Sequence, residues 1–131
     1  MDSVTCLLVD DDRDDREFFC MAVEEMGLPV ECLMAEGGQE ALDMLHDLKS
    51  LPDYVFMDMN MPRMSGIECL ERIRSDIKLK ELRVIMFSTS SDKTIVQRTT
   101  DAGANSFLTK PIHLKDLSAS LSQIIQPDLI S

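Results

Sequence analysis

Acidic side chains gather at two places in the sequence where a short apolar run has just ended. A trio of carboxylates, Asp10 to Asp12, follows one such run, and Asp58 follows another. Clustered carboxylates cannot all stay ionised without a cation, and oxygen ligands suit Mg²⁺, which typically takes one or two carboxylates and keeps several waters. If the fold brings the two groups together, these residues predict a divalent metal site.

A hydroxyl and an ammonium group follow two later apolar runs. Ser88 comes directly after the run 84–87, and Lys110 stands shortly after the run 106–108. Taken singly, both residues are ordinary, because serine and threonine often cap helices and most lysines are solvated. Beside a metal site, however, a hydroxyl and an ammonium group can hold a phosphoryl group.

The source of that phosphoryl group is expected to be a partner protein. Nucleotide phosphates are commonly cradled by glycine-rich loops that follow a strand. The sequence contains neither the GxGxxG pattern nor the GxxxxGKS/T pattern. A nucleotide ligand is therefore disfavoured.

The elements that must position these residues follow from the hydrophobic pattern. Apolar runs bounded by turn residues alternate with amphipathic stretches, which is typical of βα units and a parallel sheet. A last helix beginning near Leu114 is expected to end at Pro127. The predicted fold class is α/β, with a five-stranded parallel sheet of flavodoxin-like order 2-1-3-4-5 and helices on both faces. The predicted strands are 4–9, 30–35, 54–57, 84–87 and 106–108.

The strand order decides whether the carboxylates meet. In the order 2-1-3-4-5, the first and third strands flank the point where the order reverses, and ligands bind beyond their carboxyl ends. Asp10, Asp11 and Asp58 follow these two strands. We therefore expect the three side chains to converge.

For the next acids along the chain we favour a structural role. Asp12, Asp14 and Asp15 stand at a predicted helix start, where acidic side chains cap the helix and interact with its dipole. The alternation of Asp10, Asp12 and Asp14 also begins like a calcium-binding loop. The positions that such a loop reserves for glycine and a bidentate glutamate hold Asp15 and Met21, so calcium binding is disfavoured.

Length and charge restrict the classes of function. The 131 residues predict a single domain over 1–131, and 24 acidic against 13 basic residues give a net charge of -11. This charge disfavours nucleic-acid and anionic membrane partners. No apolar run reaches the roughly 20 residues of a membrane span, the amino terminus lacks a basic leader, and the four cysteines form no CxxC pair. The cytoplasm is the expected location.

Several short motifs together resemble the receiver domain of bacterial two-component response regulators. The likeness covers nearly the whole chain and is closest to the stand-alone type that the chemotaxis response regulator represents. The motifs are an acidic pair after the first strand, a D-x-N-M-P-x-M-x-G run, a hydroxyl residue, a Gly-Ala pair and a Lys-Pro pair. They stand here as Val9-Asp10-Asp11, the run MDMNMPRMSG at 57–66, Ser88, Gly103-Ala104 and Lys110-Pro111.

The resemblance implies a phosphoryl acceptor and a metal site. Asp58 would accept a phosphoryl group from a histidine kinase, forming an acyl phosphate. The carboxylates of Asp11 and Asp58 and the main-chain carbonyl of Asn60 would hold Mg²⁺. Asp10 would contribute to the metal site directly or through a bound water.

The resemblance also implies residues that hold the phosphoryl group. Lys110 would pair with Asp58 and later with a phosphoryl oxygen, and Ser88 would contact another oxygen. The amides of Met59 and Thr89 would complete the binding site. The peptide bond between Lys110 and Pro111 is expected to be cis, as is usual in the family.

A switch is implied as well. Movement of the Ser88 hydroxyl toward the phosphoryl group would allow Phe107 to turn inward and alter the nearby surface. For Phe107, simple core packing is an equally good interpretation, and it lacks the hydroxyl of a tyrosine.

Two rival functions fit the residues less well. A phosphatase with Asp58 as nucleophile is disfavoured, because Asn60 stands where a second aspartate would be the general acid. A phosphate-independent interaction module usually lacks an acceptor or the lysine, and both are present. Two roles stay open: a terminal switch acting on a downstream target protein, or an intermediate that passes the group to a histidine phosphotransfer protein. The protein would be a monomer or a dimer that forms on phosphorylation.

Overall fold

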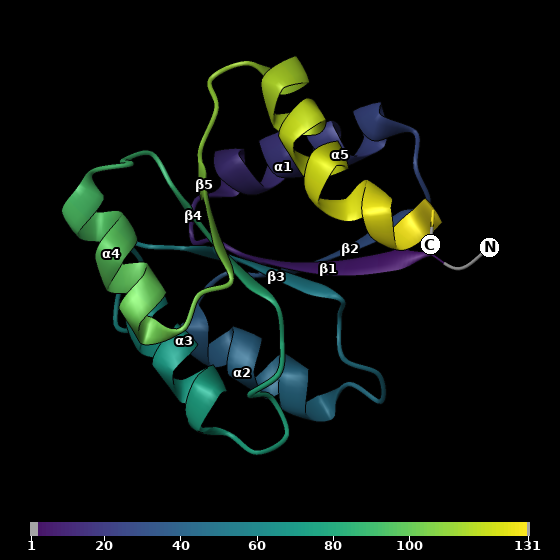
Figure 1. Ribbon diagram of the computed structural model, residues 1–131. Helices are drawn as coiled ribbons and strands as arrows, with labels where there is room; N and C mark the ends of the chain where they lie inside the picture. Colours follow the sequence, from purple (N-terminus) through teal and green to yellow (C-terminus); the bar gives the residue numbers. More distant parts are fainter. Residues whose placement is uncertain (1–2, 131) are drawn as a thin grey trace.

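The computed structural model describes residues 3–130 and contains a five-stranded parallel sheet in the order β2-β1-β3-β4-β5 (Figure 1). The predicted fold class and strand order are confirmed. Three of the strands extend one residue beyond the predicted end, so that β3 ends on Asp58 and β4 on Ser88. The strands are β1 (Val4–Val9), β2 (Val30–Ala35), β3 (Tyr54–Asp58), β4 (Val84–Ser88) and β5 (Ser106–Thr109).

Helices cover both faces of the sheet. In Figure 1, α1 and α5 lie on one face, and α2, α3 and α4 lie on the other. No helix in the described part of the chain is long and apolar enough to cross a membrane. The helices are α1 (Arg13–Met26), α2 (Gly38–Asp47), α3 (Gly66–Ser75), α4 (Lys93–Ala102) and α5 (Leu114–Ile130).

A hydrophobic core lies on each face of the sheet. Along β3, Val55 and Met57 belong to the core beneath α2 and α3, whereas Phe56 belongs to the core beneath α1 and α5. All five residues of β3 are buried. A strand buried on both faces is apolar along most of its length, which explains why 54–57 appears in the sequence as a continuous apolar run; Asp58, at the last position, is the charged exception.

The predicted end of the last helix is wrong. Helix α5 runs through Pro127 to Ile130. A proline lacks only its own N–H and disturbs one carbonyl of the preceding turn, so near the end of a helix it removes a single hydrogen bond. The buried Leu117, Leu121 and Ile125 hold the helix on the sheet before that point.

Candidate functional site

Three polar side chains leave the carboxyl edge of the sheet on the side of α1 and α5. Residues two apart along a strand share a face. Asp10, Asp58 and Lys110 each stand two residues after a side chain that packs in or against the core on this side: Leu8, Phe56 and Leu108. The alternation that builds the core thus also brings these three polar groups together.

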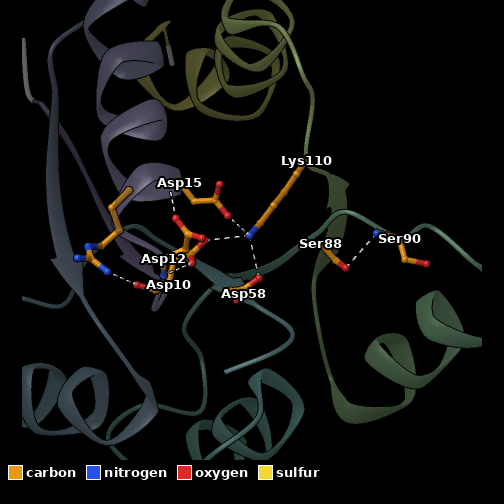
Figure 2. A network of polar contacts seen from close by, with 8 residues as sticks. Asp10, Asp12, Asp15, Asp58, Ser88, Ser90 and Lys110 are labelled. Carbon is orange, nitrogen blue, oxygen red and sulfur yellow. Dashed lines mark hydrogen bonds and ion pairs between the residues drawn. The ribbon is translucent and has the colours of Figure 1, made fainter. Parts of the chain in front are cut away.

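The Lys110 ammonium joins three carboxylates from different parts of the chain. Its Nζ atom lies 2.9 Å from Asp10 Oδ2, 2.9 Å from Asp15 Oδ2 and 2.9 Å from Asp58 Oδ1 (Figure 2). Burial lowers the pKa of Lys110, but the hydrogen bonds to these carboxylates outweigh burial and raise the pKa above its usual value. Lys110 is therefore a fixed positive charge at neutral pH.

Asp10 is fully buried and uses both of its carboxylate oxygens. Oδ2 pairs with Lys110, and Oδ1 accepts the main-chain N–H of Asp12 at 2.9 Å. The main-chain oxygen of Asp10 accepts from Arg16 Nη1, also at 2.9 Å. Burial raises the pKa of Asp10, although the hydrogen bonds from the Asp12 N–H and from Lys110 act in the opposite direction. Asp10 is thus held rigidly between β1 and α1.

Asp58 is 7% exposed and stands at the last position of β3. Burial, followed by the negative charges of Asp10 and Asp11, raises its pKa to about 6, against the opposing effect of Lys110. At pH 7 most of the Asp58 carboxylate is still ionised. Asp58 is therefore a mostly ionised carboxylate, and the negative charges around it favour the binding of a further cation.

Asp10, Asp11 and Asp58 could together hold a metal ion. One oxygen atom from each lies within 4.8 Å of the others. Asp11 is exposed, so an ion here could keep part of its water shell. Several carboxylates with access to water suit Mg²⁺. A divalent cation would also offset the negative charges of Asp10 and Asp11, which raise the pKa of Asp58. The donor set therefore fits the expected metal.

Gly66 explains the glycine at the end of the motif that contains Asp58. Its N–H donates to the main-chain oxygen of Met59 at 2.9 Å, so the start of α3 lies directly against the end of β3. A Cβ atom at position 66 would collide with the main-chain oxygen of Asp58. The close approach therefore requires glycine.

Ser88 is buried at the end of β4, and its hydroxyl faces away from Asp58 in Figure 2. The Oγ atom accepts the main-chain N–H of Ser90 at 3.2 Å. The main-chain oxygen of Ser88 accepts the Lys110 N–H at 2.7 Å, which ties the ends of β4 and β5 together. Phe107 is partly buried and packs on the core beneath α2 and α3.

Two further findings concern residues near Lys110. The expected cis bond before Pro111 is wrong, because the peptide is trans. For an X-Pro bond the trans form is favoured by about 0.5–1 kcal/mol. With this trans bond, Lys110 contacts the three carboxylates.

The other finding is a site residue that the sequence did not reveal. Asp12 is the N-cap of α1 and accepts the Asp15 N–H at 3.1 Å, as the capping prediction requires. The Asp15 side chain, however, pairs with Lys110. The only indication in the sequence was that Asp15 lies in the first helical turn after a strand end.

Comparison with known families and proteins supports the resemblance to receiver domains. The sequence model described as "response regulator receiver domain" matches residues 6–122. The chain is 31% identical over 119 residues to the chemotaxis protein CheY1 of Helicobacter pylori, covering 91% of this chain and 94% of that protein. It is 32% identical over 122 residues to the phosphate regulon transcriptional regulatory protein PhoB of Pseudomonas aeruginosa, covering 93% of this chain but only 52% of PhoB.

Solved structures show the same architecture. The phosphorylated cyanobacterial phytochrome response regulator RcpA superposes with a TM-score of 0.85 at 26% identity, covering 97% of this chain and 96% of that chain. The Mn²⁺-bound form of the response regulator Rcp1 superposes with a TM-score of 0.78 at 25% identity, covering 92% and 91% of the two chains.

Proposed function

This chain belongs to the response regulator receiver family, and from that premise we propose that Asp58 is the residue that accepts the phosphoryl group. Receiver domains of this family are regulatory, phospho-accepting signalling switches. The observation that carries the assignment is the 2.9 Å contact between Asp58 Oδ1 and Lys110 Nζ, beside the carboxylates of Asp10 and Asp11. This arrangement supplies an ionised oxygen, a fixed ammonium and a set of metal ligands at one edge of the sheet.

The proposed reaction moves a phosphoryl group from a phosphohistidine of a kinase or phosphotransfer protein. An oxygen of Asp58 forms a bond to phosphorus while the phosphorus–nitrogen bond breaks, and the imidazole nitrogen takes the electron pair and a proton. Lys110 then offsets charge on the phosphoryl oxygens. We assign the remaining contacts to the Ser88 hydroxyl and to the main-chain amides of Met59 and Thr89.

Mg²⁺ is the proposed cofactor. When bound, it supplies positive charge that neutralises the carboxylates and the phosphoryl oxygens. Asp10, Asp11, Asp58 and the main-chain carbonyl of Asn60 are the proposed ligands. The Mn²⁺-bound form of Rcp1 and the phosphorylated form of RcpA, two structures with this fold, support both the metal and the modification.

The proposed switch joins Ser88 to Phe107. The Ser88 hydroxyl exchanges the Ser90 N–H for a phosphoryl oxygen, and the freed space lets Phe107 turn further into the core. Because β4 and β5 are hydrogen-bonded neighbours, the change reaches the surface around α4 and β5. The ¹⁹F NMR signal of fluorophenylalanine at position 107 should shift on phosphorylation, and should not shift in Ser88→Ala.

The wider role stays a set of predictions. The partners are a histidine kinase or histidine phosphotransfer protein and a downstream target protein, with no direct nucleic-acid or membrane contact. A single receiver domain over 1–131, a monomer or phosphorylation-dependent dimer, and a cytoplasmic location remain expectations. The terminal switch and the phosphorelay intermediate both remain open.

Intact mass spectrometry tests the assignment of Asp58. The protein is incubated with Mg²⁺ and acetyl phosphate beside Asp58→Asn and a sample with chelator. We expect one added phosphoryl group that requires both Asp58 and the metal. Equal labelling of Asp58→Asn would place the acceptor elsewhere.

A further inference from the structure

Asp15 contacts the proposed phosphorylation site although the family motifs do not include it. Its Oδ2 atom lies 2.9 Å from Lys110 Nζ. Figure 2 shows the Asp15 side chain reaching from the first turn of α1 toward the ammonium, which also contacts Asp10 and Asp58. The Asp15 side chain is 43% exposed, whereas that of Lys110 is 11% exposed. The contact therefore closes the solvent side of the cluster.

The three contacts together saturate the lysine. An ammonium group has three N–H donors, and here three carboxylates each lie 2.9 Å from Nζ. Any new oxygen that Lys110 binds must therefore replace one of the present partners. A phosphoryl group on Asp58 brings such oxygens to this position.

The three carboxylates have different roles in the proposed reaction. Asp58 becomes an acyl phosphate in the proposed reaction, and Asp10 is a proposed metal ligand. Asp15 is outside the group of three acids that can share a metal ion in the described part of the chain. It is therefore the partner of Lys110 that need not change when metal and phosphoryl group arrive.

We propose that Asp15 is a positioning residue that keeps the Lys110 ammonium beside Asp58 throughout the phosphorylation cycle. This inference rests on the proposed function, because it concerns the same site. The other two partners of Lys110, Asp10 and Asp58, themselves take part in the proposed metal binding and phosphorylation. In this chain a helix residue adds an anchor that is independent of them.

The backbone of α1 supports this role by fixing where Asp15 stands. The Asp15 N–H donates to Oδ1 of Asp12, the N-cap of the helix. Arg16, the next residue, donates to the main-chain oxygen of Asp10 at 2.9 Å. The first bond fixes the first turn of α1 to its N-cap, and the second attaches this turn to the residue that follows β1. The carboxylate of Asp15 is therefore presented to Lys110 by a rigid support.

A neighbouring acid supplies the matched control. Asp14 belongs to the same first turn, is exposed and forms no ion pair or side-chain hydrogen bond within residues 3–130. Asp15→Ala and Asp14→Ala remove the same charge from almost the same place. Only Asp15→Ala removes a partner of Lys110, so differences between the variants report the contact.

The first measurement needs no phosphorylation. Exchange of the Lys110 ammonium protons with water is followed by ¹⁵N NMR in metal-free protein. Loss of one acceptor should make exchange at least about threefold faster in Asp15→Ala than in Asp14→Ala. Equal exchange in the two variants would overturn the anchoring role.

The second measurement follows the reaction. With Mg²⁺ and acetyl phosphate, we expect Asp15→Ala to be labelled about three- to tenfold more slowly than Asp14→Ala, because its ammonium is less well placed. Equal or faster labelling of Asp15→Ala would overturn the proposal. If Asp58→Asn is labelled as fast as the unmodified protein, the proposed function fails, and the exchange measurement alone then decides whether Asp15 anchors Lys110.

Discussion

Lys110 reaches Asp58 by crossing an intervening strand. Lys110 follows β5 and Asp58 ends β3, and β4 lies between these two strands. The Nζ atom passes over the ring of Phe87 on β4, 5.3 Å from its centroid, before it contacts Asp58 Oδ1 at 2.9 Å. Neighbouring strands are about 4.8 Å apart, so the contact requires a long side chain. The apolar ring beneath it keeps water away from the lysine stem.

Removing the ammonium should destabilise the protein. Lys110→Ala leaves Asp10 and Asp58 buried without their cation, and breaking a buried pair in this way is costly. We expect the free energy of unfolding in metal-free buffer at pH 7 to fall by about 2–3 kcal/mol, as measured by urea denaturation. Mg²⁺ should restore part of the loss. Unchanged stability would show that Lys110 does not balance these acids.

The raised pKa of Asp58 predicts how stability depends on pH. Its pKa is about 6 in the folded protein against 3.8 ordinarily, so the folded state holds the proton more tightly than the unfolded state. Ionised Asp58 therefore costs stability above pH 6, and the cost disappears as the pH falls toward 4. Without metal, Asp58→Asn should be more stable than the unmodified protein by up to about 3 kcal/mol at pH 7, since one pKa unit corresponds to about 1.4 kcal/mol.

Denaturation of both proteins between pH 4 and pH 7 with chelator present measures that difference. Carboxylates far from Asp58 also titrate in this range, but they are common to both proteins and cancel. The two stabilities should converge near pH 4. A difference that is constant over the whole range would assign the effect to packing rather than to charge.

Metal affinity should depend on Asp11. Asp11→Asn removes one of the three carboxylates that lie within 4.8 Å of one another. We expect the dissociation constant of Mg²⁺ to rise about tenfold or more in calorimetric titration, because a charged ligand is replaced by a neutral one. Asp14 is a nearby exposed acid outside this group, so the Asp14→Asn variant should bind Mg²⁺ almost as the unmodified protein does. An unchanged titration of Asp11→Asn would move the metal elsewhere.

A methyl group at position 66 should disturb Asp58 through the backbone. The added Cβ would meet the main-chain oxygen of Asp58, and neither segment can yield without moving the end of β3 or the start of α3. Gly66→Ala should lower the free energy of unfolding by about 2–3 kcal/mol and slow phosphorylation.

Gly37 offers the control for that substitution. It also stands at the start of a helix, and nothing lies within 4 Å of a Cβ built there. Gly37→Ala should therefore cost less than about 1 kcal/mol in the same denaturation experiment. Similar losses in both variants would mean that the contact with Asp58 has no special importance.

Much of the site was predictable because it lies at strand ends. Apolar runs mark the strands, and the carboxyl ends of parallel strands share one edge of the sheet. A residue that directly follows such a run is therefore placed at that edge before any tertiary detail is known. This reasoning located Asp10, Asp58, Ser88 and Lys110, and the family motifs added the metal and the acceptor role.

The sequence by itself determined where the strands lie, the edge at which the polar residues gather and the chemistry that they offer. Only the tertiary structure decided that Asp15 contacts Lys110, that the Ser88 hydroxyl bonds Ser90, and that α5 continues through Pro127. The physical reason is that strand periodicity is a local property, and the carboxyl ends of parallel strands share one edge of the sheet. How a helix docks on the sheet, and which of several acceptors a side chain takes, depend on packing between segments that are distant in the sequence.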